Sequence, residues 1–137
     1  MKKDKILVFF IFPFLILILL LLNIFLPGKK DKRLKTIDYK LNGVEYKLLL
    51  ADDEAEWVKG LMGYKKKEGF DGMLFIFPDK KHRQFWNKNT YLDLDIYWLD
   101  DKTVVSKSFL PSINKTGKIV IVNSPKEVNH VIELIVD

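Results

Sequence analysis

One stretch decides the fold class: Thr36-Ile37-Asp38-Tyr39-Lys40-Leu41-Asn42-Gly43-Val44-Glu45-Tyr46-Lys47-Leu48. Polar and apolar side chains alternate on both sides of Asn42-Gly43, which is the pattern of strands with one buried face. Asn-Gly is favoured in two-residue hairpin turns, because both central positions of a type I′ turn take a positive φ. The stretch therefore predicts a β-hairpin.

Further short apolar or alternating runs follow this hairpin and are separated by turns. They lie at residues 73–77, 83–87, 92–99, 103–110, 118–122 and 128–136. Pro78 is expected to end the first of these runs, and residues 79–82 to form a turn. The seven or eight short strands at this spacing predict a mainly β domain, with a sandwich-like or barrel-like arrangement.

One short helix is predicted after the hairpin. Asp53 and Glu56 have the spacing of a capping box, in which the two side chains accept N–H groups at the start of a helix. The helix should continue to about Leu61 and stop before Gly63.

The first 33 residues differ from the rest. The uncharged run of residues 6–26 would form a helix about 30 Å long, which is the thickness of a bilayer's hydrocarbon core. We expect a single transmembrane helix in contact with lipid, within a membrane anchor and basic linker over residues 1–33. A β-rich soluble domain would then occupy residues 34–137. The alternative is a cleaved signal peptide, but no alanine precedes Ala51 to form an Ala-x-Ala cleavage site.

The net charge of +5 lies in the predicted anchor. Residues 1–33 carry seven basic and two acidic side chains, whereas residues 34–137 carry sixteen of each. A neutral domain offers no basic surface for nucleic acid, and lysines beside a span suit anionic headgroups. More basic residues follow the run than precede it, which by the positive-inside rule favours a cytoplasmic domain. The short N-terminal tail resembles a signal anchor instead, so we expect a single-pass protein with an extracytoplasmic domain.

Several kinds of site lack the residues that they need. The chain has no cysteine, and it has no Gly-x-Gly-x-x-Gly, P-loop or Gly-x-Ser-x-Gly pattern. His82 lies in a charged turn, and His130 should face the opposite side of its strand from Glu133. A metal site that uses these histidines with Asp95 or Glu133 therefore lacks a fixed ligand geometry. We expect no metal and no cofactor.

The densest polar and aromatic chemistry lies just after residue 84. Trp86, Lys88 and Asn89 offer an aromatic platform, a cation and an amide, which together can hold an anionic or hydroxyl-rich ligand. The structural alternatives are that Trp86 fills the core and that Asn89 serves a turn.

Two carboxylates follow this segment. If residues 92–99 form a strand, Asp93, Asp95 and Tyr97 share one face and Leu94, Ile96 and Trp98 share the other. Paired carboxylates can perform acid–base chemistry or bind calcium, and the alternative is a solvated outer face.

These segments resemble the domain-of-unknown-function 192 family of small bacterial and archaeal proteins. The family pattern reads Arg-Gly-Leu-Met, Gly-Met-Leu-Phe-x-Phe and Phe-Trp-Met-Lys-Asn-Thr-x-x-Pro-Leu-Asp, and it closes with Ser-Pro and a Leu-Glu-Leu-like strand. The matching stretches here are residues 59–62, 72–77, 85–95, 124–125 and 132–134. The resemblance implies a mostly β, sandwich-like domain whose biochemical activity is not established.

The resemblance also bears on individual residues. It adds Lys59, Met62, Thr90 and Glu133 to the site candidates. The chain departs from the pattern at three positions: Lys59 stands for arginine, Asn87 for methionine and Asp93 for proline. Lysine lacks the two-pronged hydrogen bonding of arginine, so a site that needs the arginine would be weakened here.

The leading hypothesis is a membrane-tethered, non-enzymatic ligand-binding or accessory module at the cell envelope, which binds a sugar or an envelope polymer. Its candidate site residues are Trp86, Lys88, Asn89, Thr90, Asp95, Lys59, Met62 and Glu133. A second hypothesis is a hydrolase that uses Asp95 or Glu133 as general base and Lys88 to stabilise negative charge, which predicts that these groups share a cleft. A third is a structural partner of another membrane protein, which predicts an exposed apolar patch beside Trp86.

Overall fold

The structure, a computed structural model, describes residues 34–136, and the predicted transmembrane run 6–26 lies outside the described residues. Eight strands and two short helices make up the described part, which confirms a mainly β domain. In chain order they are β1 (Thr36–Leu41), β2 (Val44–Ala51), α2 (Glu54–Lys59), β3 (Gly72–Lys81), β4 (Gln84–Trp86), β5 (Leu94–Asp100), β6 (Thr103–Leu110), α3 (Ile113–Thr116), β7 (Ile121–Asn123) and β8 (Val128–Ile135). Within residues 34–136 no helix is long and apolar enough to cross a bilayer.

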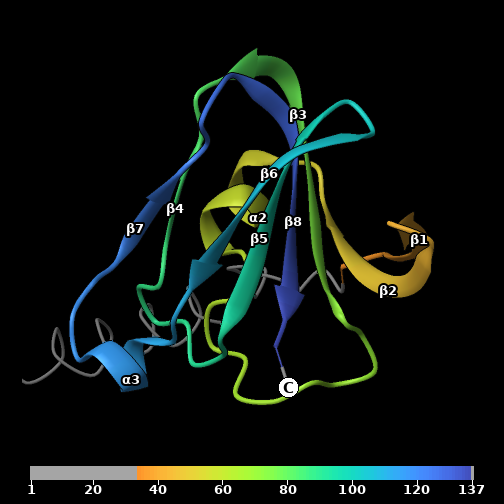
Figure 1. Cartoon of the computed structure of the whole chain (residues 1–137). Helices are drawn as coiled ribbons and strands as arrows, with labels where there is room; N and C mark the ends of the chain where they lie inside the picture. Colours follow the sequence, from red (N-terminus) through yellow and green to blue (C-terminus); the bar gives the residue numbers. More distant parts are fainter. Residues whose placement is uncertain (1–33, 137) are drawn as a thin grey trace, which may run out of the picture. The chain divides into compact units, whose positions relative to one another are not determined.

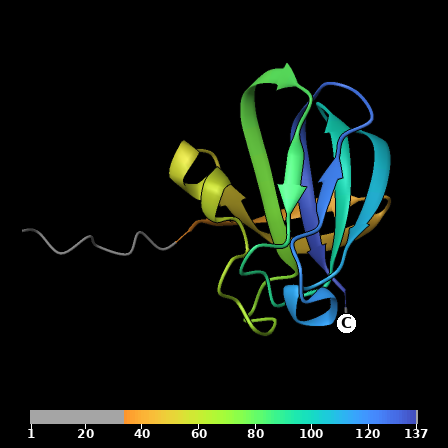
Figure 2. The same cartoon turned by 90° about the vertical axis from the view of Figure 1, so that its left-hand side faces the viewer.

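The strands form a large sheet and a small one. The large sheet has the order β1-β2-β3-β8-β5-β6, in which only β2 and β3 run parallel. The small sheet contains β4 and β7, which are antiparallel. Figures 1 and 2 show β4, β7 and α2 over one face of the large sheet, an arrangement between an open barrel and a sandwich. The last strand in the chain, β8, is central because it pairs with both β3 and β5.

Both faces of the large sheet are apolar, because successive side chains of its strands point alternately into two hydrophobic clusters. The face toward α2, β4 and β7 carries Met73, Phe75, Ile96 and Trp98, among others. The opposite face carries Leu48, Leu74, Leu99 and Ile132, together with the half-buried tyrosines of the β1–β2 hairpin. The first cluster lies beneath the candidate site.

The local sequence rules predict the hairpin and the start of the helix. Asn42 and Gly43 have φ values of 50° and 86°, and Leu41 pairs with Val44, as a type I′ hairpin requires. Asp53 Oδ1 accepts the Glu56 N–H at 2.9 Å, and Glu56 Oε2 accepts the Asp52 N–H at 3.0 Å. The capping box is thereby confirmed, with the return bond made one residue earlier than in the usual motif.

Two element boundaries and one helix differ from expectation. The helix ends at Lys59 with Gly60 as C-cap at φ 48°, and not near Leu61, because the chain reverses at Gly60. Strand β3 continues through Pro78 to Lys81, where a terminating proline and a turn were expected. Pro78 is tolerated because pairing with β8 is irregular between Ile76 and Lys81, so no regular ladder needs its missing N–H. The one-turn helix α3 was not predicted.

Two glycines in this framework should respond differently to a methyl group. A Cβ at Gly72 would lie 1.9 Å from the Glu133 carbonyl oxygen, whereas a Cβ at Gly43 would meet nothing within 4 Å. Gly43→Ala should cost about 1 kcal/mol from its positive φ alone. Gly72→Ala should cost more than about 3 kcal/mol, because β3 and β8 must separate. Urea unfolding of both variants tests this, and equal losses would contradict the close β3–β8 approach.

Candidate functional site

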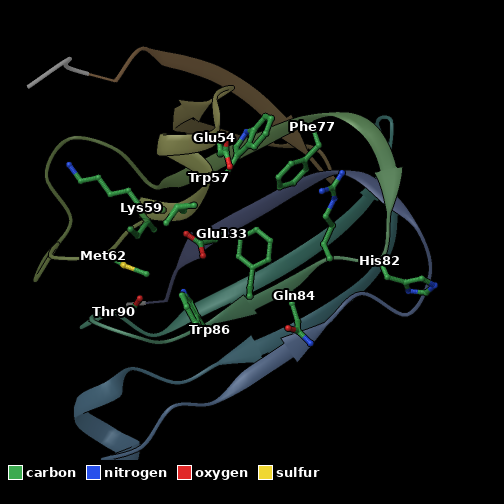
Figure 3. A pocket seen from close by; sticks show the side chains of 15 residues that line it. Glu54, Trp57, Lys59, Met62, Phe77, His82, Gln84, Trp86, Thr90 and Glu133 are labelled. Atoms are coloured by element: carbon green, nitrogen blue, oxygen red, sulfur yellow. The ribbon is translucent and has the colours of Figure 1, made fainter.

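A groove of about 360 Å³ lies over the centre of the large sheet. One wall is formed by α2 and the turn that follows it, and the other by β4 and the residues before it (Figure 3). The lining residues are Glu54, Trp57, Val58, Lys59, Gly60, Leu61, Met62, Phe77, His82, Arg83, Gln84, Phe85, Trp86, Thr90 and Glu133. We call this cavity the Glu133 groove.

Glu133 lies at the floor of this groove. Its neighbours across the sheet are Met73 and Ile96, which belong to the apolar cluster on the groove side. The residue is 4% exposed, and its Oε2 atom has no hydrogen-bond partner among residues 34–136. Gly60 lies directly against it, since a Cβ built on Gly60 would be 3.6 Å from that oxygen. The sheet thus holds a carboxyl group among apolar side chains.

Burial determines the protonation of Glu133. Desolvation raises the pKa of its carboxyl group to about 8, and a hydrogen bond from the Leu61 backbone opposes this only in part. At neutral pH the group is therefore mainly a neutral acid, which offers one O–H donor and one carbonyl acceptor.

Arg83 supplies a second polar atom to the groove. Its guanidinium lies 3.9 Å from the centre of the Phe77 ring, and Nη2 donates to Asp79 Oδ1 at 2.6 Å and to the Asp79 carbonyl at 2.7 Å. Its Nε atom is buried without a partner in the described part of the chain. Arg83 Nε and Glu133 Oε2, which belong to two residues of the same groove lining, thus both lack the hydrogen bonds that buried groups normally make.

The walls of the groove are mainly aromatic. Trp57 and Phe77 pack with ring centres 5.0 Å apart, and Phe85 lies edge-on to Phe75 at 4.9 Å. Trp86 is 44% exposed at the rim, where the Lys88 ammonium lies 5.3 Å from the centre of its ring. An apolar channel with two polar atoms and an exposed indole has the composition of a binding site.

Five of the eight sequence candidates line the groove: Trp86, Thr90, Lys59, Met62 and Glu133. Asp95 does not. It faces the other side of the sheet, beside Leu134 in the neighbouring strand, and it pairs with Lys107 at 2.7 Å. The two alternative general bases, Asp95 and Glu133, therefore lie on opposite faces of the sheet, and the cation paired with Asp95 is Lys107 and not Lys88.

Lys88 and Asn89 occupy the exposed corner of a turn, outside the groove lining. The Thr90 N–H donates to the Asn87 carbonyl at 3.0 Å, which closes the turn. Asn89 has φ 54°, a conformation that asparagine tolerates better than most residues. Its carbonyl accepts the Gly63 N–H at 3.0 Å and so joins this turn to the segment after α2. The turn explanation for Asn89 therefore has direct structural support.

Asn87, which sequence reasoning treated only as a departure from the family pattern, is fully buried and structural. Its Nδ2 donates to the Pro111 carbonyl at 2.9 Å and to Thr116 Oγ1 at 3.1 Å. Its Oδ1 accepts the Val120 N–H at 2.8 Å. The amide thus connects β4 to the segment that contains α3.

Asp93, the other unexpected residue in this segment, contacts the same part of the chain. Its carboxylate accepts the Ser112 N–H at 2.8 Å and pairs with Lys115. Burial opposes ionisation of this carboxyl, but the Lys115 and Ser112 hydrogen bonds outweigh it and lower the pKa. Asp93 is therefore committed to holding α3 and is not half of a catalytic pair with Asp95.

One further acidic group needs an explanation. Carboxylate oxygens of Asp52, Asp53 and Glu56 lie within 4.8 Å of one another. The capping bonds at the start of α2 account for this closeness, since Asp53 and Glu56 accept backbone N–H groups there.

The two histidines lie apart. His82 lines the groove, while His130 lies on the opposite face of β8 from Glu133, as expected.

Sequence comparison identifies the family. Residues 37–136 match the family model DUF192, described as "Uncharacterized ACR". The chain belongs to this family. Two stretches that carry the resemblance contribute to the Glu133 groove: Lys59-Gly60-Leu61-Met62 forms part of one wall, and Glu133 of the Ile132-Glu133-Leu134 stretch lies at the floor. Comparison with curated proteins gives no match.

Two solved structures resemble this DUF192 member. One, from Sinorhizobium meliloti 1021, is described as a proposed transcription regulator; it is 28% identical, with a TM-score of 0.57 over 73% of this chain and 78% of that one. The other, a protein of unknown function from Novosphingobium aromaticivorans DSM 12444, is 20% identical, with a TM-score of 0.64 over 80% of this chain and 79% of that one. The second likeness shows the shared fold alone.

Glu133 should make the stability of the domain pH-dependent. The native carboxyl holds its proton up to pH about 8, whereas an ordinary glutamate releases it near 4.5. The native state therefore binds more protons in this window, and stability should fall as pH rises through it, by up to roughly 1.4 kcal/mol per unit, and level off above about 8. Urea unfolding across this range should show the decline in the wild type and not in Glu133→Gln. Equal slopes in the two proteins would contradict the assignment.

Asn87 should matter for stability and Lys88 should not. Asn87→Ala leaves the Val120 N–H and the Pro111 carbonyl without their side-chain partner in a buried site, so it should cost roughly 2–4 kcal/mol. Lys88→Ala removes an exposed side chain from the same turn and should change stability by less than about 0.5 kcal/mol. Thermal unfolding of the two variants compares them directly, and similar losses would show that Asn87 is not a structural link.

Proposed function

We propose that this protein is a membrane-tethered ligand-binding module of the cell envelope and that the Glu133 groove is its binding site. The observation that carries the proposal is the Glu133 carboxyl, which is buried with an unpartnered oxygen at the floor of an open groove. Burying such a group costs stability unless something completes its hydrogen bonds, and a bound ligand would do so.

The chemistry of the groove favours an uncharged polar group within an apolar ligand. Neutral Glu133 can both donate and accept a hydrogen bond, and Arg83, in the same lining, has an Nε donor without a partner in the described residues. The aromatic walls around Trp57, Phe77 and Phe85 would exclude water from these contacts. Such a ligand would recover the hydrogen bonds that the free protein lacks.

Tethering is supported by the sequence. The 21 uncharged residues 6–26, flanked by lysines, match the length of a bilayer span, and only a short basic linker separates them from Leu34. We propose a single span with an extracytoplasmic domain. Transcriptional regulation, suggested by the description of the Sinorhizobium structure, finds no support in the charge, because residues 34–137 carry sixteen basic and sixteen acidic side chains.

Hydrolysis is less well supported than binding. Asp95 is engaged with Lys107 on the opposite face of the sheet, and Lys88 lies over Trp86 outside the groove lining. Of the three residues that the hydrolase hypothesis names, only Glu133 lines the groove, so it lacks the cationic partner that the hypothesis assigns to Lys88.

A screen on the full chain in detergent tests the proposed site. The probes are a panel of neutral oligosaccharides and a panel of unstructured peptides, with thermal shift as the readout. At least one panel should raise the melting temperature of the wild type, since a probe at 100 times its Kd adds about 2.7 kcal/mol. Glu133→Gln and Trp86→Ala should weaken that probe at least tenfold, because both remove groups of the groove.

Asp95→Asn is the matched control, because it neutralises a carboxyl on the other face of the sheet. It should leave the affinity for the same probe within about threefold of the wild type. A probe whose binding is lost in Asp95→Asn and retained in Glu133→Gln would place the site elsewhere. The absence of any shift from either panel would overturn the proposal.

A further inference from the structure

We infer that the Glu133 groove takes an extended polypeptide segment, which adds to the free edge of β4 as a third strand of the small sheet. This inference rests on the proposed function and names the class of ligand. The observations that carry it concern the backbone of β4, whereas ligand binding in general is supported by the side chains of the groove.

The hydrogen-bond pattern of β4 shows which way its backbone groups point. The Arg83 carbonyl accepts the Ser124 N–H at 2.9 Å, and the Asn87 N–H donates to the Val120 carbonyl at 3.2 Å. Residues 83 and 87 thus bond to the β7 side. In a regular strand, backbone groups alternate between the two edges, so those of Gln84 and Trp86 point away from β7. Both residues line the Glu133 groove.

This edge of β4 has no strand beside it. Within residues 34–136, β4 pairs with β7 alone, and α2 forms the opposite wall of the groove (Figure 3). Exposed edges are usually blocked by lysine, proline or a covering element, because they pair readily with other chains. Strand β4 reads Gln84-Phe85-Trp86, without charge or proline, and the space beside it is a cavity.

The side chains around this edge match an extended segment as well. Alternate residues of an added strand would point inward and outward. The inward ones would reach Phe77, Arg83 Nε and Glu133, which favours an uncharged polar side chain such as a carboxamide between apolar neighbours.

The outward residues would continue an apolar surface that already exists. Trp86 is 44% exposed and faces Ile121, its register partner in β7, which is 49% exposed. Ile119, two residues earlier, is 53% exposed. This patch beside Trp86 is what the protein-partner hypothesis predicted, and an outward side chain of the added strand would cover part of it. An oligosaccharide would use Trp86 but would leave the backbone groups of β4 without their sheet partners.

The test uses the full chain in detergent and a phage library of random ten-residue peptides, followed by affinity measurements on a synthetic enriched peptide. Gln84→Pro removes an N–H from the groove edge and leaves the bonds of residues 83 and 87 to the β7 side in place. It should weaken the peptide at least tenfold. Gln84→Ala keeps the N–H and should weaken it at most threefold, and Asp95→Asn, outside the groove, should match the wild type.

A second measurement does not depend on the folding of Gln84→Pro. N-methylation of the peptide should weaken binding at least tenfold at alternate residues and less than threefold at those between, because only alternate N–H groups of an added strand face β4. A peptide affinity that is unchanged by both Gln84→Pro and N-methylation would overturn the strand addition. If no peptide binds but a neutral oligosaccharide does, and Glu133→Gln abolishes its binding, the site stands and the peptide inference fails. If neither probe class binds, both fail.

Discussion

The burial of the Glu133 carboxyl at the centre of the large sheet is the constraint on which the site depends. Strand β8 pairs on both sides, so Glu133 cannot rotate its backbone toward solvent. Gly72 permits the tight approach of β3 at that position, because any side chain there would collide with the Glu133 carbonyl. The sheet therefore fixes a titratable group beneath apolar walls, and burial keeps it protonated at neutral pH.

Helix α2 and strand β4, which form the two walls of the groove, leave the space above Glu133 open. Helix α2 stops at Lys59, and Gly60 turns the chain at a positive φ directly over the carboxyl. On the other side, β4 is only three residues long and pairs with β7 on the edge away from the groove. The cavity thus lies between α2 and β4, which do not pair with each other.

The parts of the fold that depend on residues close together in the sequence were predictable. The Asn42-Gly43 turn and the Asp53–Glu56 capping box follow from local backbone geometry, and both were confirmed. Pro78 was misjudged because the rule that proline ends a strand assumes a regular ladder, and pairing with β8 is irregular there. Helix α3 was missed because Asn87, from a distant part of the chain, holds its segment through Thr116.

The site was only partly predictable, and the division has a physical cause. Residue chemistry left Trp86 as either an aromatic platform or a core residue, and its 44% exposure argues against the core. It could not separate Asp95 from Glu133, because only sheet register shows that they face opposite sides. The residues of the family pattern likewise divide into those that form a turn and those that meet in the groove. Asn89 and Thr90 form and close a turn, whereas Gly60 and Glu133 are 73 positions apart in the sequence and lie against each other in the groove. The dense motif includes the turn of residues 87–90, whereas the unpartnered Glu133 oxygen on which the proposed site rests is visible only in the structure.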